Sequence, residues 1–200
     1  MKLIAEGRAS EIFDLGDGRV LRRFKAGGDP GGEARAMEHA RRHGYPVPQV
    51  HEVREDALVL ELVQGPTMAA HGRANPSTME AQAETLADLH DRLHRIPGLE
   101  GGALLHLDLH PENVLLSDRG PVVVDWTNAE DGDPALDPAL AWLILMTSGG
   151  APGQAFAEMF ARHVDVRSGL EEAARYRLAD PNVTDAERAD IRLLLASQYD

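Results

Sequence analysis

Residues 106–116 read HLDLHPENVLL, and residues 122–126 read VVVDW. Each segment contains a short apolar run typical of a strand, and the residues between them are turn formers. Together they predict a hairpin with Asn113 and Asp125 at the two ends of its base. The carboxylates of Asp108 and Asp125 and the carboxamide of Asn113 would then lie close together. Such hard oxygen groups are typical of a site for phosphate and magnesium chemistry.

The composition limits the class of protein and its partners. A chain of 200 residues with 43% hydrophobic content can bury a core in one large domain or in two small lobes that share a cleft. Its 20 basic and 33 acidic residues give a net charge of −13, which disfavours nucleic acid and anionic membranes as partners and favours a cationic small molecule. Because the chain has no cysteine, disulfides and thiolate metal sites are excluded.

Two segments bear on the location of the protein. The N-terminal MKLIAEGR has too few apolar residues for a signal peptide. The longest apolar run, Ala139–Met146, is too short to span a bilayer. We therefore expect a cytoplasmic protein with no membrane partner.

The first 64 residues are predicted to form an N-terminal lobe with a small antiparallel sheet. One helix, Glu33–His43, is expected to begin after Gly31 and Gly32 and to end at Gly44. The expected strands, separated by turn residues, are Glu11–Leu15, Arg19–Phe24, Val50–Val53 and Ala57–Leu62.

Residues 65–76 are rich in Gly, Pro, His and Asn, which is typical of a connection between lobes. Residues 77–200 are predicted to form a helical lobe that carries the loop and hairpin described above. Its first helix follows the capping-box pattern Ser77–Glu80 and ends before Pro97. Later helices are expected at Pro138–Met146, at Gln154–Val164, from Gly169 onward, and after a cap at Thr184.

The two opening segments, with Gly132-Asp133-Pro134 and Asp137 after them, resemble the aminoglycoside phosphotransferase and choline-kinase-like branch of the protein-kinase-like fold. In that branch the catalytic loop reads HGDLHPGNIL and the metal-binding strand reads IDWE. The resemblance implies a two-lobed α+β fold, with a small antiparallel-sheet N-lobe and a mostly helical C-lobe. In addition, residues 177–187, RLADPNVTDAE, resemble a short bacterial subgroup related to trifolitoxin-immunity proteins.

The resemblance implies a role for each residue of the catalytic loop and the metal strand. Asp108 would accept or orient the proton of the acceptor hydroxyl. Asn113 and Asp125 would hold the Mg²⁺ ions that bridge the phosphates of ATP. His106 would brace the loop, and Asp137 would bind the backbone amides of the loop.

The resemblance also implies nucleotide-binding residues in the N-lobe. Gly7, in EGRASEIF, occupies the place of the phosphate-covering loop, although related loops have more glycines. Arg22 stands where a phosphate-binding lysine is expected. Glu33 is either its ion-pair partner or an exposed first-turn acid. Glu61 and Val63 would mark the hinge whose backbone meets adenine.

The chain departs from the family pattern at Leu107, where glycine is common, and at Glu112, where a small residue is frequent. The backbone at Leu107 must therefore either avoid a positive φ or carry strain.

The resemblance implies a small-molecule kinase with a nucleotide-binding N-lobe that moves the γ-phosphate of ATP to a hydroxyl group. Two alternatives remain open. One is a catalytically impaired kinase-like protein that binds a nucleotide or acts in immunity. The other is a metal-dependent hydrolase, in which His106, Asp108 and His110 share one face of an extended segment and bind zinc or iron.

Overall fold

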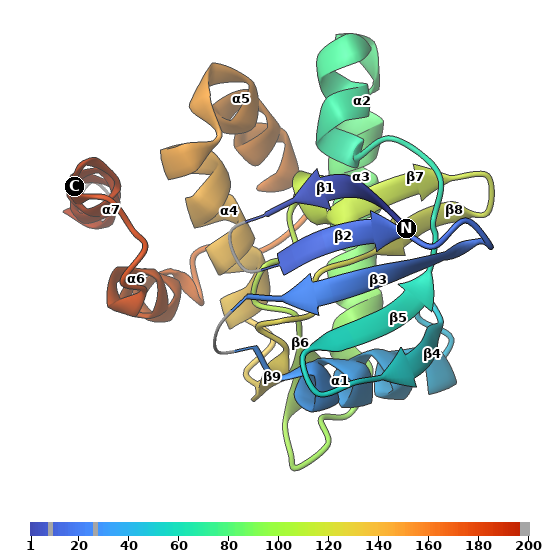
Figure 1. Cartoon of the computed structure of the whole chain (residues 1–200). Helices are drawn as coiled ribbons and strands as arrows, with labels where there is room; N and C mark the ends of the chain where they lie inside the picture. Colours follow the sequence, from blue (N-terminus) through green and yellow to red (C-terminus); the bar gives the residue numbers. More distant parts are fainter. Residues whose placement is uncertain (8–9, 26–27, 197–200) are drawn as a thin grey trace.

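The computed structural model describes residues 1–7, 10–25 and 28–196 and has two lobes (Figure 1). The N-lobe is built on a five-stranded antiparallel sheet with the strand order β1-β2-β3-β5-β4. The C-lobe is mostly helical. The two-lobed α+β fold predicted from the sequence is confirmed.

Four of the five N-lobe strands lie within one residue of their predicted bounds, and β1 was not predicted. All residues of β1 are exposed, so the strand has no alternation of buried and exposed positions to reveal it. It pairs with β2 at the sheet edge. The strands are β1 (Lys2–Glu6), β2 (Ser10–Asp14), β3 (Arg19–Phe24), β4 (Val50–Val53) and β5 (Ala57–Glu61).

Helix α1 (Pro30–Arg42) begins three residues earlier than predicted. The Asp29 side chain caps it by accepting a hydrogen bond from the Gly32 amide at 2.9 Å, and Pro30 suits the first helical position. The two glycines taken for a boundary therefore lie in the first turn. Glu33 consequently faces inward from that turn, and it is buried.

The predicted connection, residues 65–76, is not structureless. It contains helix α2 (Met68–Ala74), whose N-cap is Thr67. The 3₁₀ helix η1 (Pro76–Thr78) begins at the last residue of the predicted connection. Only seven residues long, α2 is too short for a clear apolar period. Gly65 has a φ of 142°, and a Cβ there would lie 2.1 Å from the Leu116 carbonyl oxygen. Only glycine fits this crossing over the hairpin.

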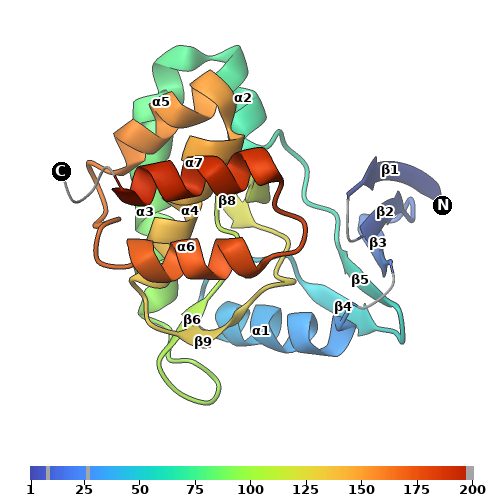
Figure 2. The same ribbon diagram turned by 90° about the vertical axis from the view of Figure 1, so that its left-hand side faces the viewer.

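The C-lobe helices follow the sequence predictions with some shifts in their bounds. The capping box predicted at Ser77–Glu80 is wrong, because the N-cap of α3 (Met79–His94) is Thr78, whose side chain makes no capping hydrogen bond and donates to the Asn75 carbonyl instead. The Thr184 cap is confirmed by a hydrogen bond of 3.2 Å from the Glu187 amide. Figure 2 shows α6 and α7 side by side. The remaining helices are α4 (Leu136–Ser148), α5 (Gly150–Phe160), α6 (Leu170–Ala179) and α7 (Asp185–Ala196).

Two short antiparallel pairs carry the catalytic-loop segment. Val114 pairs with Val123 in the predicted hairpin, and the Val124 amide donates to the Asn113 carbonyl at 3.0 Å. The hairpin base therefore has Asn113 and Asp125 at its two ends, as predicted. The elements are β6 (Ala103–Leu105), paired with β9 (Glu130–Gly132), then η2 (Pro111–Asn113), β7 (Val114–Ser117) and β8 (Gly120–Val123).

A hydrophobic core runs through both lobes, from Phe24 and Leu58 of the sheet to Phe160 and Ile191 of the helices. Burial of this continuous surface fixes the lobes against each other. In the described residues, no helix combines the length and apolar character needed to cross a membrane.

Candidate active site

The catalytic loop leaves β6 through a strained residue. Leu107 has a φ of 58°, which an L-residue adopts at a cost of about 1–2 kcal/mol. Of the two possibilities that the sequence left open, strain is therefore the correct one. The Leu107 side chain is buried, and burying a leucine gains about 1.5–3 kcal/mol, which offsets the strain.

Asp137, in the first turn of α4, holds this backbone in place. Its carboxylate accepts the His106 amide at 2.9 Å and the Leu107 amide at 2.7 Å. His94 Nε2 lies 3.1 Å from the same carboxylate. Burial raises the pKa of Asp137, but these donors and the neighbouring histidines outweigh that effect and hold the pKa well below its usual value. The predicted contact between Asp137 and the loop amides is confirmed.

The Asp108 side chain is oriented from two sides. Asn113 Nδ2 donates to the Asp108 carboxylate at 2.9 Å and to its carbonyl at 2.8 Å. His110 Nε2 lies 3.3 Å from the other carboxylate oxygen. Both contacts are made by Asn113 Nδ2, so its Oδ1 takes no part in them. One asparagine thus orients a carboxylate and keeps its oxygen for another contact.

His106 is fully buried. Its Nε2 lies 3.2 Å from the Val124 carbonyl, and its ring packs edge-on against Trp126 at 4.8 Å. Burial lowers the pKa of His106, so the ring is neutral near pH 7. These contacts connect the catalytic loop to the metal strand.

The zinc or iron site of the hydrolase alternative is not formed. Within residues 1–7, 10–25 and 28–196, the one group of three or more His, Asp or Glu residues clustered closely enough to hold a metal is His90, His94 and Asp137. That group lies beneath the loop.

Arg22 is buried and is the centre of an ion-pair cluster that joins the lobes. Its guanidinium contacts the Glu33 and Asp125 carboxylates directly. It also donates to Thr127 Oγ1 at 2.8 Å and to Ser10 Oγ at 3.1 Å. The pairing of Arg22 with Glu33 is therefore confirmed, and Asp125 is a second partner that the sequence did not indicate.

The two carboxylates of this cluster titrate differently. Burial, aided by the charge of Asp125, raises the pKa of Glu33 to about 7 despite the attraction of Arg22. The side chain of Asp125 is 44% exposed. Burial acts to raise the pKa of Asp125, but the charge of Arg22 and the hydrogen bonds from Thr127 and Arg22 outweigh it and lower the pKa. One cation cannot fully compensate two carboxylates, so the deeper one retains a proton more readily.

A cleft of about 660 Å³ brings together Gly7, Asp108 and Asp125. Its wall also includes Ser10 and Thr127. Residues of α6 and the following turn contribute as well, namely Tyr176, Arg177, Ala179, Asp180 and Asn182. Most of these wall residues come from parts of the chain far from the catalytic loop, so their spacing in the sequence did not indicate that they share a site with Asp108. Residues 8 and 9 of the predicted phosphate-covering loop lie outside the described residues.

The predicted hinge residues do not line this cleft among the described residues. Glu61 ends β5, and its side chain pairs with Arg119 at 2.6 Å and accepts the Gln49 amide at 3.2 Å. Val63 follows the strand and is half-buried. Their contact with adenine stays a prediction.

The fold and this site define the class of kinase-like phosphotransferases. The model of the phosphotransferase enzyme family matches residues 100–178, and the RIO domain model matches residues 31–135, just over half of the chain. Both matches include the catalytic loop and the metal strand. The chain belongs to the kinase-like family of the RIO domain, whose model covers more than half of it, and residues 100–178 also match the phosphotransferase enzyme family.

Solved structures show the same fold. The chain is similar to a thermostable mutant of aminoglycoside phosphotransferase APH(4)-Ia in its apo form, with a TM-score of 0.72 and 17% identity over 98% of this chain and 94% of that chain. A ternary complex of such a mutant with ADP and hygromycin B has a TM-score of 0.72 and 18% identity, covering 99% and 94%. At these identities the likeness concerns the fold alone.

A curated relative matches over a shorter stretch. The thiamine kinase of Salmonella paratyphi B is 44% identical over 41 residues, which are 20% of this chain and 15% of that protein. The chain thus matches only a small part of the length of the curated relative. The predicted resemblance to trifolitoxin-immunity proteins stays a prediction.

Proposed function

We propose that this chain is an ATP-dependent phosphotransferase that transfers the γ-phosphate to a hydroxyl group of a small molecule. The observation that carries this proposal is the oriented Asp108 carboxylate, held by Asn113 and His110, in the same cleft as Asp125. The family membership and the ADP complex of a structural relative support it. A cytoplasmic location fits this chemistry and is part of the proposal.

In this mechanism Asp108 accepts or orients the proton of the acceptor hydroxyl. Asn113 and His110 keep its carboxylate aimed, so little reorganisation is needed when the acceptor arrives. Asp137 holds the loop backbone at Leu107, immediately before Asp108. The network therefore positions the base through two layers of contacts.

The donor set at the hairpin base fits magnesium. Both contacts described for Asp125 end on Oδ1, which leaves Oδ2 as a ligand. Asn113 Oδ1 would be a second ligand, and magnesium prefers such oxygens while it retains several waters. When bound, magnesium would neutralise charge on the phosphates. Arg22 and Gly7 would bind phosphate from the N-lobe side of the cleft, and Glu33 would hold Arg22 in place. The backbone at Glu61 and Val63 would contact adenine.

The first test compares ADP release by the wild type and Asp108→Asn over a panel of amino alcohols, aminoglycosides and sugars. We expect kcat to fall by roughly 10²–10⁴-fold in the variant, since that is the usual contribution of a positioned proton acceptor. Asp118→Asn, in the exposed hairpin turn, is the matched control and should leave kcat unchanged. Equal turnover by Asp108→Asn and the wild type would show that the mechanism is wrong.

One observation favours a second candidate, a kinase-like protein that binds nucleotide without turnover. Arg22 contacts Asp125, the carboxylate assigned to magnesium, and so competes with the metal. Arg22→Lys tests this point because its compact ammonium lacks the fork that grips two carboxylates. Faster ADP release would mean that the arginine impairs catalysis, and slower release would mean that the guanidinium is used. Nucleotide binding without ADP release by either form would favour the second candidate.

A further inference from the structure

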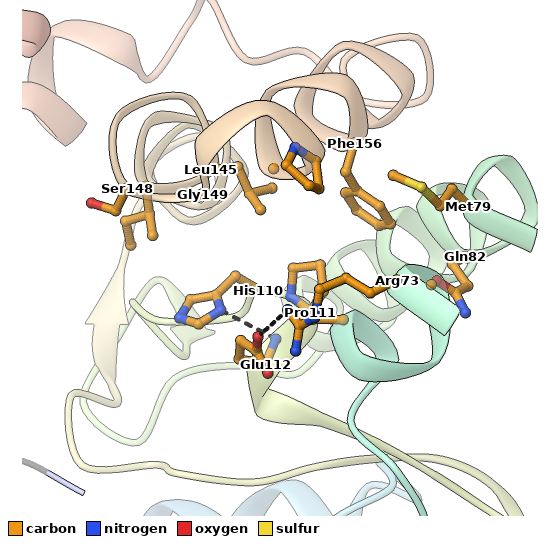
Figure 3. Close-up of a pocket in the computed structure, with 15 residues that line it drawn as sticks. Arg73, Met79, Gln82, His110, Pro111, Glu112, Leu145, Ser148, Gly149 and Phe156 are labelled. Atoms are coloured by element: carbon orange, nitrogen blue, oxygen red, sulfur yellow. Dashed lines mark hydrogen bonds and ion pairs between the residues drawn. The ribbon is translucent and has the colours of Figure 1, made fainter. Parts of the chain in front are cut away.

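A second cavity of about 420 Å³ lies beside the catalytic loop, within the size range of ordinary small-molecule pockets. Figure 3 shows His110, Pro111 and Glu112 on one side and the residues of α4 and α5 on the other. His110 and Ile144 line both this cavity and the cleft that contains Asp108. A molecule in the cavity could therefore extend an arm past His110 to the reactive carboxylate.

The walls of this second cavity are mainly apolar. Met79, Leu145 and Phe156 face it from three helices, and Pro111 and Pro152 complete much of the surface. An aromatic ring and a thioether favour contact with a flat ring of the ligand. The cavity thus suits a ring better than a heavily hydroxylated or aminated sugar, whose polar groups would lose water without finding partners.

The two charged residues of the cavity neutralise each other. Arg73 pairs with Glu112 at 2.7 Å, and Glu112 also accepts the Thr67 hydroxyl at 2.9 Å. No unpaired carboxylate of the described lining remains for a polycation. The local charge of the pocket therefore differs from the strongly acidic balance of the whole chain.

One polar atom of the lining has no partner. Gln82 is 6% exposed, its Nε2 lies 2.8 Å from His71 Nδ1, and its Oε1 has no hydrogen-bond partner within the described part of the chain. A buried acceptor without a hydrogen-bond partner destabilises the protein. Gly72 lies close to this oxygen, because a Cβ at that position would be 2.7 Å from it. Gln82 lines the cavity, so a small shift of its side chain would bring Oε1 to an N–H or O–H donor of a ligand.

We infer that this cavity binds the body of the phosphate acceptor, and that the acceptor is a neutral or singly charged ring compound with a hydrogen-bond donor on the ring and a hydroxyl arm. The inference rests on the proposed function. Phe156 and Met79 contact the ring, Gln82 Oε1 accepts its donor, and the arm passes His110 toward Asp108. The pocket selects against polycationic aminosugars.

The test uses two ring probes, a hydroxyethyl-substituted aminopyrimidine and its dimethylamino analogue, which lacks the N–H donor. Kanamycin serves as the polycation. Calorimetry on the full chain with ADP and magnesium gives the dissociation constants. We expect saturable binding of the aminopyrimidine, and Gln82→Met should weaken it by about 5- to 10-fold, as loss of one hydrogen bond predicts. The same variant should bind the dimethylamino analogue as the wild type does.

Two further variants separate the pocket from general effects on folding. Gly72→Ala places a methyl against Gln82 Oε1 and should weaken the aminopyrimidine alone, while alanine keeps α2 helical. Gln154→Met makes the same chemical change on the exposed face of α5, outside the lining, and should change no dissociation constant. Circular dichroism confirms that each variant is folded.

The outcomes distinguish this inference from the proposed function. Kanamycin binding at least as tightly as the aminopyrimidine, no binding of the aminopyrimidine, or equal weakening of both ring probes by Gln82→Met would each overturn the pocket assignment. Gln82-dependent binding with no ADP release from ATP would support the pocket assignment and count against phosphotransfer. ADP release with kanamycin alone would retain phosphotransfer and overturn the ring-shaped acceptor.

Discussion

Glu33 is the residue whose environment departs most from what its sequence position suggested. An acid in the first turn of a helix usually faces solvent, but this one is buried beside Arg22 because α1 begins at Pro30. Its pKa of about 7, against an ordinary value of 4.5, means that the folded state favours the protonated form. Ionisation of Glu33 therefore opposes folding.

From this shift we predict a decrease in stability as the pH rises from about 4.5 to about 7, because the folded chain binds more protons than the unfolded chain in that window. Glu33→Gln should flatten this part of the profile. The measurement is the free energy of unfolding in urea at several pH values. Glu38→Gln, exposed on the same helix, is the control. Identical slopes for Glu33→Gln and the wild type would show that Glu33 does not titrate in this range.

At the scale of elements, α4 organises the catalytic loop. Asp137 lies in the first turn of this helix, and its two hydrogen bonds to loop amides connect α4 to the segment after β6. Because the pKa of Asp137 is held below its usual value, its contribution to stability is present above about pH 4 and is lost as the pH falls below that value.

Asp137→Asn should lower both stability and activity. The amide nitrogen of asparagine cannot accept a hydrogen bond, so one buried backbone amide loses its acceptor, at a cost of about 2–3 kcal/mol. The Asp108 carboxylate would also lose its fixed position, and ADP release should slow. Urea unfolding and turnover measure the two effects. Asp133→Asn, exposed just before α4, should change neither, and a neutral result at Asp137 would contradict the positioning role.

The element predictions from sequence succeeded where a local pattern existed and failed where it did not. The hairpin at the catalytic loop has apolar runs and a turn within a few residues, so its pairing followed from neighbouring positions. The β1 strand and the short α2 lack such a signal, because β1 is exposed throughout and α2 has only about two turns. Tertiary contacts, not local preference, stabilise both elements.

In the whole molecule, Arg22 joins the lobes. It lies 103 positions from Asp125 in sequence, yet the two side chains pair across the cleft. A buried arginine that holds two carboxylates is costly to remove, because the acids are left without compensation. The relative position of the lobes thus depends on a cluster that contains candidate catalytic groups.

Arg22→Met should destabilise the protein by about 3–5 kcal/mol, the usual cost of leaving buried charge unpaired. The double variant Arg22→Met with Glu33→Leu should recover a large part of this loss, since it removes the buried acid as well. Thermal and urea unfolding report both. Arg23→Met, the exposed neighbour on β3, is the control. If Arg22→Met were no worse than Arg23→Met, the cluster would not hold the lobes together.

The sequence by itself determined the chemistry of the catalytic loop, since Asp108, Asn113 and Asp125 lie close together along the chain and short spacing constrains where their side chains can meet. Only the tertiary structure decided the pairing of Arg22 with Asp125, the burial of Glu33 and the unpaired oxygen of Gln82, because each depends on elements that approach when the common core forms. Local spacing encodes a loop, whereas burial and long-range contact set the charge, the pKa and the shape of the pocket around it.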